Sequence, residues 1–398
     1  MAVGWWSGGK SSLSGLMPLK IFITNDAYLP GFRFGGPVRS LANLVDWLGE
    51  RYEIHIFTKD RDLGNKVGYP GLSANQWLSC GEAQIFYASP DQHKPERALK
   101  EIKRIQPDVV YLNGLWEGMT RGLLKTRLPR ARYVIAPRGA LGAGALAIKP
   151  LKKKLGLLLM RSSLQGLVWH VTAESEAAEV REVIGSQESV CMAANLIERR
   201  VADATGRLPE MREVGAIRFV AFSRLSRKKN FDFLLSCLQS VDGAFSLDII
   251  GPEEDPAYAS ELKELAKQLG PNQVVQFLGE KSPAELTALL PRYDFFVLPT
   301  QHENFGHVFI EAWAAGLPVI TSDQTPWRDL QAKGIGWDIP LSKRELWIEL
   351  FESIIQIQPD ELMKLKMQSA CFVADMAQQQ PLDAYKRLFE GCTENPSI

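Results

Sequence analysis

The 398-residue chain carries 46 Lys and Arg against 46 Asp and Glu, so its formal net charge is zero, and 45% of its residues are hydrophobic. A neutral chain has no global field that would attract nucleic acid, and this apolar content is ordinary for a globular protein of about two to three domains. No apolar run reaches the roughly 18 residues of a transmembrane helix, and the scattered cysteines lack the spacing of a zinc site or a disulfide framework.

The N-terminal segment, residues 1–17, is rich in Gly and Ser, and we expect it to be a disordered leader. It contains Gly4–Ser11, which fits the P-loop pattern G-x4-G-K-[ST]. A functional P-loop follows a strand and opens a helix, but only three residues precede Gly4 and a weak helix former follows. We therefore expect no nucleotide at this match.

Short apolar runs alternate with helical stretches in the first half of the chain. The runs predict strands at 19–24, 54–58, 84–87, 109–112, 133–136 and 168–172. This alternation of strand and helix is typical of a mostly parallel sheet, in which functional residues gather at the carboxyl ends of the strands. Asn113 and Arg138 each follow such a strand and are candidate acceptor or sugar contacts, although a strand-end ion pair would also explain Arg138.

A glycine-rich loop after the first predicted strand contains Gly35 and Gly36 and leads into a helix marked by apolar residues at helical spacing. A strand, a glycine loop and a helix in this order present backbone N–H groups to an anion. Two glycines by themselves are also explained by a plain turn.

The segment 149–161 is a basic and apolar cluster, with three consecutive lysines, Lys152, Lys153 and Lys154, ahead of a leucine run. Such a segment resembles an interfacial helix on anionic lipid. The alternative is a helix with a solvated basic end and a buried remainder.

Apolar patterning thins and charge rises over 195–215, where we place the linker between two domains. The second half then predicts further strands at 217–223, 247–250, 274–278, 295–298, 318–321 and 337–339. Arg224 and Lys229 lie in the loop between the first of these strands and a helix. A guanidinium fork and an ammonium point charge suit a diphosphate, although Lys228 competes with Lys229 for this role and a solvated basic loop is the alternative.

The most informative stretch runs from 295 to 323 and predicts a strand, a loop, a helix and a second strand. Glu303 lies in the loop and Glu311 lies eight residues later, in the first turns of the helix that starts after Gly306. The helix N-terminus favours phosphate, so the two acids can address sugars on either side of a diphosphate. A βαβ unit with two solvated acids is the alternative.

This pattern, Glu-x7-Glu with Asn-Phe-Gly after the first Glu and then Glu-Ala-x-Ala-Ala-Gly-x-Pro-Val, resembles the retaining glycosyltransferases of family 4. The resemblance covers nearly everything from Leu19 to Phe389. It implies an α/β protein of GT-B fold, with two Rossmann-like domains whose parallel sheets face each other across a cleft. The implied domains are an acceptor-side domain at 18–200, a nucleotide-sugar domain at 215–375, and a C-terminal helix at 376–398 that packs back on the first domain.

The resemblance also implies roles for individual residues. Glu303 and the backbone amides after it hold the donor sugar and phosphate, Glu311 holds the ribose, and Arg224 and Lys229 neutralise the leaving diphosphate. The implied catalytic set is Glu303, Arg224 and Lys229. The implied donor-binding set is Glu311, Gly35, Gly36, Asn304, Phe305, Gly306, His307 and Gly279. Related enzymes often carry His at the position of Asn113, so this chain departs from them there.

The implied function is that of a retaining, metal-independent hexosyltransferase in cell-surface polysaccharide biosynthesis, such as exopolysaccharide or lipopolysaccharide assembly. We expect a donor of the UDP- or GDP-sugar type, a glycan or lipid-linked acceptor, and no cofactor, metal or nucleic acid. The expected location is cytoplasmic, with candidate peripheral contact at the anionic inner face of the membrane. Two alternatives remain, a GT-B nucleotide-sugar epimerase and a non-catalytic two-lobed binding protein.

Overall fold

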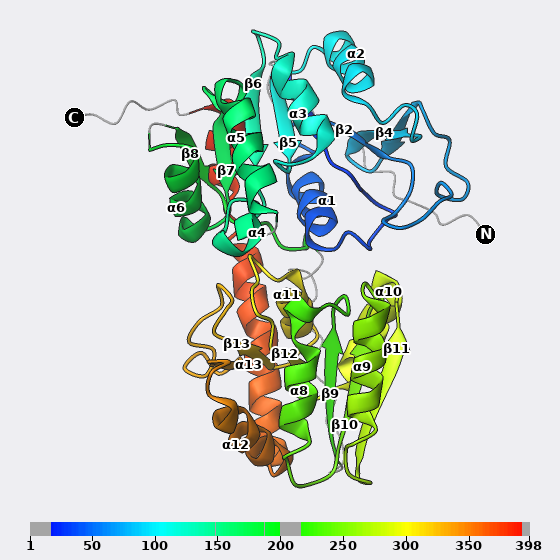
Figure 1. The fold of residues 1–398 in the computed structure, drawn as a ribbon, viewed down its shortest axis with the longest axis vertical. Coiled ribbons are helices and arrows are strands. Elements are labelled where there is room, and N and C mark those ends of the chain that lie inside the picture. The colour runs from blue at the N-terminus through cyan, green and yellow to red at the C-terminus, as the bar shows by residue number, and fades with distance from the viewer. Residues whose placement is uncertain (1–16, 148, 187, 200–215, 392–398) are drawn as a thin grey trace. The chain divides into compact units, whose positions relative to one another are not determined.

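The computed structural model describes residues 17–147, 149–186, 188–199 and 216–391. These residues fold into two compact units (Figure 1). Unit 1 contains the residues up to Leu196 together with those from Gln380 onward, and unit 2 contains Ile197–Gln379. The expected leader, the P-loop match and most of the expected linker lie outside the described residues.

Unit 1 is built on an eight-stranded sheet in the order β3-β4-β2-β1-β5-β6-β7-β8. Its strands are β1 Lys20–Thr24, β2 Glu53–Lys59, β3 Trp77–Cys80, β4 Ala83–Ala88, β5 Val109–Asn113, β6 Arg132–Ala136, β7 Val168–Val171 and β8 Ser189–Met192. Its helices are α1 Gly36–Leu48, α2 Pro95–Ile105, α3 Gly118–Lys125, α4 Ala143–Ala147, α5 Pro150–Leu164, α6 Glu174–Val183 and α14 Leu382–Glu390. All neighbouring strands are parallel except β3 and β4.

Alternate residues of the unit 1 strands build two separate hydrophobic cores, one on each face of the sheet. Ile21, Ile23 and Tyr111 pack with α1 and α14, whereas Phe22, Val110 and Leu112 pack with α2, α3, α5 and α6. Because side chains alternate in direction along a strand, a strand covered on both faces must be apolar throughout. This requirement explains why the central strands are continuous apolar runs.

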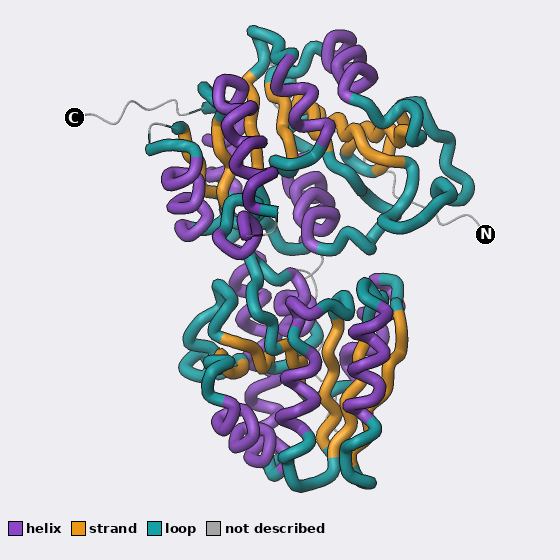
Figure 2. Tube along the Cα trace, viewed as in Figure 1, coloured by secondary structure: helices purple, strands orange, loops and turns teal. Residues whose placement is uncertain are grey.

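Unit 2 is built on a six-stranded, wholly parallel sheet in the order β11-β10-β9-β12-β13-β14 (Figure 2). Its strands are β9 Ile217–Phe222, β10 Phe245–Ile250, β11 Gln273–Gly279, β12 Phe295–Leu298, β13 Val319–Ser322 and β14 Gly336–Ile339. Its helices are α8 Phe231–Leu238, α9 Pro256–Ala266, α10 Pro283–Leu289, α11 His307–Ala314, α12 Arg344–Ile355 and α13 Pro359–Gln378, with short 3₁₀ turns η1 Arg227–Lys229 and η2 Leu290–Arg292.

The predicted apolar runs all coincide with strands of the two sheets, which confirms the expected α/β class. The patterning missed β3 and β8, whose residues are mostly half-buried or exposed and therefore lack an apolar run. Strand β3 is also the antiparallel exception. It reaches β4 through a tight turn at Gly81, where φ is +57°, and so short a connection can join only antiparallel neighbours.

In each sheet the chain changes direction next to the first strand of the unit. In unit 1 the strands after β1 add outward as β2 and β4, and the chain then returns to the other side of β1 as β5. In unit 2 the strands after β9 add outward as β10 and β11, and the chain returns as β12. Open α/β sheets bind ligands outside the carboxyl ends of the strands at such a switch point. The topology therefore predicts ligand sites at the carboxyl ends of β1 and β5 in unit 1, and of β9 and β12 in unit 2.

Candidate active site

The switch point of unit 2 carries an ion pair. Lys229 ends the η1 turn after β9 and Glu303 lies in the loop after β12, and the Lys229 Nζ donates to Glu303 Oε2 at 2.6 Å. Only 11% of the lysine side chain and 19% of the glutamate side chain are exposed. The structure thus brings together two of the residues that the sequence singled out.

Backbone hydrogen bonds fix the loops that carry this pair. Gln301 N donates to the carbonyl of Lys228 at 2.8 Å, which ties the loop after β12 to the η1 turn. Glu303 N donates to the carbonyl of Gln324 at 3.0 Å, which ties the same loop to the one after β13. Asn230 takes a left-handed conformation, with φ of +62°, at the point where the η1 turn passes into α8. The pair is therefore held by the ends of three neighbouring strands.

The charge state of Glu303 depends on its cationic neighbours. Burial alone would raise the pKa of Glu303, but the charge and hydrogen bond of Lys229, helped by Lys228, lower its pKa overall. Burial lowers the pKa of Lys228, which lies close enough to Glu303 to interact but is the more exposed of the two lysines. Lys229 rather than Lys228 is thus the direct partner of the carboxylate.

Helix α11 begins beside this pair. Gly306 precedes it with φ of +77°, and a side chain there would meet the Phe309 ring at 2.5 Å and the Glu303 Cγ at 2.9 Å. Only glycine accepts both that conformation and that proximity. Asn304 N donates to Glu303 Oε1 at 3.2 Å, which braces the second carboxylate oxygen. Glu311 lies half-buried one turn into the helix.

Aromatic packing supports the loop before α11. The Phe305 ring contacts His307 and Trp327, with ring centroids 4.8 Å and 5.5 Å apart, and Trp327 Nε1 donates to the carbonyl of Phe305. Buried His307 is the first residue of α11. The predicted donor-binding residues from Asn304 to His307 therefore form one packed loop next to Glu303.

Other predicted residues of unit 2 lie apart from the pair. Arg224 follows β9, but its guanidinium donates to Glu254 at 2.9 Å in an exposed ion pair, so Arg224 and Lys229 bind different carboxylates. Gly279 ends β11 with φ of +67°, and its N-terminal neighbours extend the sheet edge. Both remain predicted contacts for a bound donor.

The switch point of unit 1 carries a hydrogen-bonded network centred on Arg138. Its guanidinium donates to Asn113 Oδ1 at 2.7 Å, to Asn195 Oδ1 at 2.8 Å and to the Tyr111 hydroxyl at 3.0 Å. Asn113 Nδ2 in turn donates to Asn25 Oδ1 at 3.0 Å. Tyr111 and Asn113 belong to β5, whereas Asn25, Arg138 and Asn195 follow β1, β6 and β8, so the network extends from β1 toward the β8 edge of the sheet. No described carboxylate lies within ion-pair distance of Arg138, which rules out the strand-end ion pair among the described residues.

The network continues into the core through His170. Its Nδ1 lies 2.7 Å from the Tyr111 hydroxyl and its Nε2 lies 2.8 Å from the Ala193 carbonyl. Burial and the nearby Arg138 charge lower the pKa of His170 to about 3, so the ring is neutral. A neutral ring that donates from Nε2 accepts at Nδ1, and Tyr111 then accepts from Arg138 and donates to His170. The donor and acceptor roles of Arg138, Tyr111 and His170 are therefore mutually consistent.

Gly35 and Gly36 lie at the start of α1 in unit 1. Gly35 has φ of +69° and is the N-cap of the helix, while Gly36 is its first residue. No side chain caps this end. Pro37 has no N–H group, and the N–H groups of Val38 and Arg39 donate to the Gly35 carbonyl at 3.1 Å and 3.3 Å. The order of strand, glycine loop and helix is as the sequence predicted, and a contact of Gly35 and Gly36 with a donor stays a prediction.

Sequence reasoning missed a second group at the unit 1 switch point. Lys59, at the end of β2, donates to Asp26 at 2.6 Å, and His93 lies 4.0 Å from the same carboxylate. Lys59 and His93 also line a cavity of about 340 Å³ together with Asp60, Arg61, Ala88 and Pro90. Their position in the sequence could have indicated this group, because Asp26 and Lys59 each lie just after a predicted strand.

Glu117 lies near this group and is unusual in its environment. Its Oε2 atom is buried and has no hydrogen-bond partner among the described residues. Burial and the Asp26 charge raise the pKa of Glu117. The carboxylate lies over Gly114, where φ is +111° and a Cβ would approach it within 2.3 Å. The fold thus reserves space for an acid at the end of β5.

The pair Asp60 and Asp62, which form the Asp-x-Asp of the sequence, have structural partners. Asp62 Oδ2 accepts from the backbone of Phe32 and Arg33 at 2.8 Å and 3.1 Å, and Asp60 pairs with Arg61 at 2.8 Å. Both aspartates are buried. Among the described residues, no group of three or more His, Cys, Asp or Glu side chains is arranged to hold a metal ion.

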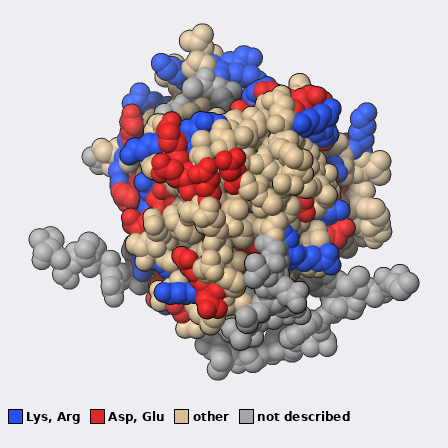
Figure 3. Space-filling model, turned by 90° about the horizontal axis from the view of Figure 1, so that it is seen from below, with Lys and Arg blue, Asp and Glu red and all other residues tan. Residues whose placement is uncertain are grey.

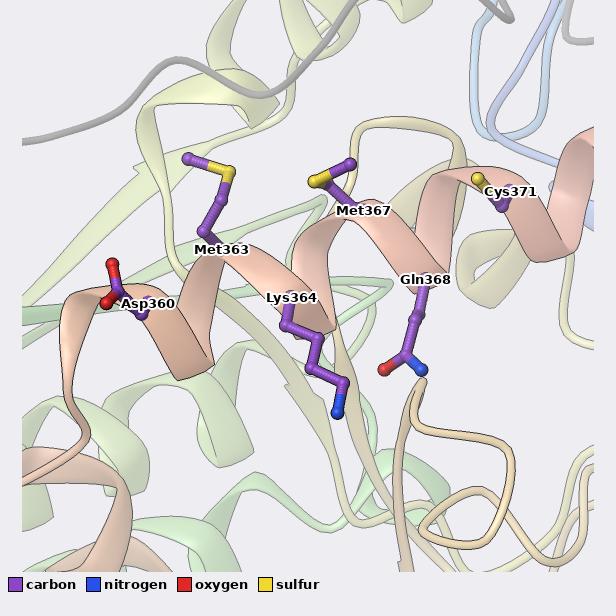
Figure 4. A pocket seen from close by; sticks show the side chains of 6 residues that line it. All are labelled: Asp360, Met363, Lys364, Met367, Gln368 and Cys371. Atoms are coloured by element: carbon purple, nitrogen blue, oxygen red, sulfur yellow. The ribbon is translucent and has the colours of Figure 1, made fainter.

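A depression of about 430 Å³ on α13 lies outside both switch points. It is lined by Asp360, Met363, Lys364, Met367, Gln368 and Cys371, all from one helix (Figure 4). Figure 4 shows the two methionines and Cys371 on one side of the helix and Lys364 and Gln368 on the other. None of the predicted site residues lines it, and a single helix offers no convergent polar groups.

Sequence comparison finds a family match within unit 2. Residues 212–369 match the family described as glycosyl transferases group 1. Unit 2 is a glycosyl transferases group 1 domain. The Lys229–Glu303 pair and α11 both lie within the matched residues of this glycosyl transferases group 1 domain.

Two curated relatives extend the comparison. The chain is 26% identical over 223 residues to the lipopolysaccharide core biosynthesis glycosyltransferase LpsD of Rhizobium meliloti, which covers 54% of this chain and 61% of that protein. It is 28% identical over 137 residues to the GDP-mannose:cellobiosyl-diphosphopolyprenol alpha-mannosyltransferase of Komagataeibacter xylinus, which covers 34% of each. The aligned regions thus span about a third to three fifths of these relatives.

Solved structures share the fold of nearly the whole chain. Sucrose-phosphate synthase from Thermosynechococcus elongatus gives a TM-score of 0.67 at 16% identity, over 94% of this chain and 100% of that one. Anabaena Alr3699/HepE, in complex with UDP and glucose, gives 0.64 at 14% identity, over 94% and 98%. At these identities the likeness concerns fold alone, and with the two parallel-sheet units it establishes the GT-B class.

We predict that Lys229→Met destabilises the protein by about 2–3 kcal/mol at neutral pH, because it leaves a largely buried carboxylate without its main cation. In the wild type the folded pKa of Glu303 is depressed, so the stability that the pair contributes is present above the unfolded pKa of about 4.3 and is lost as pH falls through the folded pKa. In the variant, burial raises the pKa of Glu303 without the opposing charge of Lys229. Acidification protonates this carboxylate, so the difference in stability between the wild type and the variant should become smaller. Thermal melts from about pH 7 to pH 4 measure this.

The matched control is Lys267→Met, which removes an exposed i,i+3 pair with Glu264 and should leave the melting temperature nearly unchanged. A wild-type melt for Lys229→Met at neutral pH, or a deficit that grows on acidification, would contradict the assigned electrostatics of the pair.

We predict that Arg138→Lys lowers the stability of the protein by about 2–4 kcal/mol, because one ammonium cannot replace three directed guanidinium hydrogen bonds to neutral partners. Melting temperature and hydrogen exchange at β5 and β6 report the loss. Arg181→Lys is the control, since the partner of Arg181 among the described residues is Glu174, in an exposed pair. Equal melts for Arg138→Lys and the wild type would show that the fork geometry is not required.

Proposed function

We propose that this protein is a retaining glycosyltransferase of family 4 that moves a hexose from a nucleotide diphospho-sugar to a glycan or lipid-linked acceptor in cell-surface polysaccharide biosynthesis. The observation that supports it most is the Lys229–Glu303 pair, which lies at the switch point of a glycosyl transferases group 1 domain beside the N-terminus of α11. LpsD of Rhizobium meliloti, one of the relatives, is named for lipopolysaccharide core biosynthesis.

In this proposal the donor diphosphate binds between Lys229 and the first N–H groups of α11. A phosphate draws the Lys229 ammonium partly away from Glu303, and the freed carboxylate then accepts hydrogen bonds from the sugar hydroxyls. Arg224 supplies a second cation once it exchanges Glu254 for phosphate. Glu311 accepts from the ribose hydroxyls. The main electrostatic work is neutralisation of the leaving diphosphate.

The chemical step breaks the bond between the anomeric carbon and the phosphate oxygen and forms the bond to the acceptor oxygen on the same face of the sugar. The acceptor proton passes to the departing phosphate oxygen, so atoms and charge balance without a protein base. Positive charge that develops on the sugar is stabilised by the nearby Glu303 carboxylate. No metal or cofactor enters this scheme.

The donor base is proposed to be of the UDP or GDP type. Anabaena Alr3699/HepE was solved with UDP and glucose, and the Komagataeibacter xylinus relative is named for GDP-mannose. A thermal-shift screen of UDP-, GDP- and ADP-sugars tests the base, because a ligand that binds only the folded state stabilises it by mass action.

The acceptor is proposed to bind unit 1. Asn113 and Arg138 at the end of the sheet are its candidate polar contacts, and Gly35 and Gly36 in the same unit are candidate donor contacts. A lipid-linked acceptor would place the reaction at the cytoplasmic face of a membrane, where the basic segment at 149–161 would meet anionic lipid. Among the described helices, none is long and apolar enough to span a bilayer.

Incubation with donor alone and with donor plus candidate acceptors separates the proposal from its alternatives. An epimerase would change the donor sugar without an acceptor, and a binding protein would be stabilised by donor without turnover. A transferase gives an acceptor-dependent product of retained anomeric configuration, which NMR of the new glycosidic bond identifies.

We predict that chelation leaves donor binding and transfer intact, because lysine, arginine and helix N–H groups neutralise the diphosphate. Thermal shifts and turnover measured with EDTA and with added Mg²⁺ or Mn²⁺ check this. Activity abolished by chelator and restored by metal would mean that the diphosphate site is assigned wrongly.

We predict that Glu303 and Glu311 fail differently when each is replaced by Ala. Glu311→Ala should chiefly raise the donor KM, by about tenfold to a hundredfold, because a ribose contact is similar in ground and transition states. Glu303→Ala should lower kcat by about a hundredfold to a thousandfold, because its charge acts on the sugar as the bond to phosphate breaks. Glu303→Gln should recover little, since charge matters more than shape.

Steady-state kinetics on one donor, with folding confirmed by thermal melts, measure this difference. Glu261→Ala is the matched control, because Glu261 forms an exposed ion pair with Arg227 in the same unit and has no proposed role. A near-normal kcat in a folded Glu303→Ala protein would remove Glu303 from the reacting sugar.

A further inference from the structure

Helix α5 exposes an unusual amount of apolar surface. Its residues Leu151, Leu155, Leu158 and Leu159 are 82%, 56%, 66% and 74% exposed. No other helix of the described chain exposes more than one large hydrophobic side chain to this degree. Single exposed leucines are ordinary, but four on one helix form a patch that needs a partner.

The four leucines form one stripe along the helix. At 100° per residue they fall within an arc of about 100°. The side chains that α5 packs against the core of unit 1, namely Leu157, Met160 and Leu164, fall in an arc of about 60° on the opposite side. The leucine stripe, residues 151, 155, 158 and 159, therefore points directly away from the domain.

Basic side chains flank the leucine stripe on both sides. Lys152 lies beyond one edge, and Lys154 and Arg161 lie beyond the other, at about 100°, 300° and 280° when Leu151 is set to zero. All three are exposed, and none forms an ion pair with a described residue. The helix has no Asp or Glu. Its outward side therefore carries leucines and cations but no acid, and Ser162 is an uncharged polar residue at about 20°, within the arc of the leucines.

The third lysine of the run has a different role. Lys153 points toward the core side, where its ammonium donates to the Ala145 carbonyl and lies 5.6 Å from the centroid of the Trp116 ring. Lys153 therefore anchors α5 to unit 1 and belongs to the fold. Of the described cations within α5, Lys152, Lys154 and Arg161 are available to an external partner.

We propose that α5 docks the protein onto an anionic lipid bilayer, with the helix in the plane of the interface. The leucine stripe enters the boundary between headgroups and acyl chains, and the flanking cations contact anionic headgroups on either side. A helix in this position carries its apolar residues on one side and Lys and Arg on both flanks, which is the arrangement observed. The lysine stems also allow the charges to reach the headgroups while the leucines are buried.

Charge decides between a bilayer and a second copy of this chain. A symmetric dimer through the leucine stripe would bring the basic flanks of both copies together, with no acid on the helix to compensate. A bilayer surface that contains anionic lipid offers the opposite sign. On the face shown in Figure 3, acidic and basic side chains are interspersed, and the formal net charge of the chain is zero.

The test is co-flotation of the full chain with vesicles of phosphatidylcholine and phosphatidylglycerol in equal amounts. Leu158→Ser/Leu159→Ser should lower the partition coefficient about tenfold or more, because two inserted side chains are lost. Leu63→Ser/Val67→Ser is the matched control, since it removes two exposed apolar residues elsewhere in unit 1 and should leave binding unchanged. Lys152→Ser/Lys154→Ser should lower partition about twentyfold at low salt and less at high salt.

All variants change exposed residues, so melting temperatures should match the wild type and confirm that binding alone is affected. Absence of wild-type flotation, or equal flotation of the wild type and Leu158→Ser/Leu159→Ser, would overturn the proposal. So would a wild-type dimer that Leu158→Ser/Leu159→Ser converts to monomer without a change in flotation. The assay measures lipid binding without substrate, so its outcome is independent of whether the protein transfers sugar.

Discussion

Glu303 keeps its negative charge in a largely buried loop because the Lys229 ammonium lies 2.6 Å away. This ion pair is possible only because β9 and β12 are parallel neighbours, so that the loops leaving them start at the same edge of the sheet. Backbone bonds from Gln301 and Glu303 to neighbouring loops fix the main chain that carries the two side chains, so little backbone freedom is left to be lost when they pair. The proposed chemistry of unit 2 depends on this preformed arrangement.

The apolar runs predicted the strands well because central parallel strands are covered on both faces and must be apolar throughout. The same reasoning could not find β3 and β8, which are partly exposed and short. Local sequence also placed Asn113 and Arg138 correctly at strand ends. Their hydrogen bond, and the part that Tyr111 and Asn195 take in the network, could not be predicted, because side-chain geometry there joins residues of β5 to residues that follow β6 and β8.

The partners of the charged side chains could not be predicted from the sequence either. The motif indicated that Arg224 and Lys229 address one ligand, yet in the structure each cation binds a different carboxylate, Glu254 and Glu303. Arg224 and Lys229 are five residues apart, which keeps them close in space. Their spacing does not predict which acid each one binds, because Glu254 and Glu303 both lie far away in the sequence. The strand order accounts for the two partners, because β9 lies between β10 and β12, and the loops after these two strands carry Glu254 and Glu303.

The polar groups at the two switch points differ in a way that bears on which unit would hold the donor. In unit 2 a cation meets a carboxylate, so a phosphate can compete for Lys229 and in doing so release Glu303. In unit 1 the Arg138 guanidinium already has three neutral acceptors, and its hydrogen bonds build the sheet edge. Breaking these hydrogen bonds would lower the stability of the protein, and because the acceptors are neutral it would not release a charged side chain that could act on a substrate. The exchangeable pair therefore favours unit 2 for the diphosphate, and the rigid network favours unit 1 as a platform on which an acceptor is oriented.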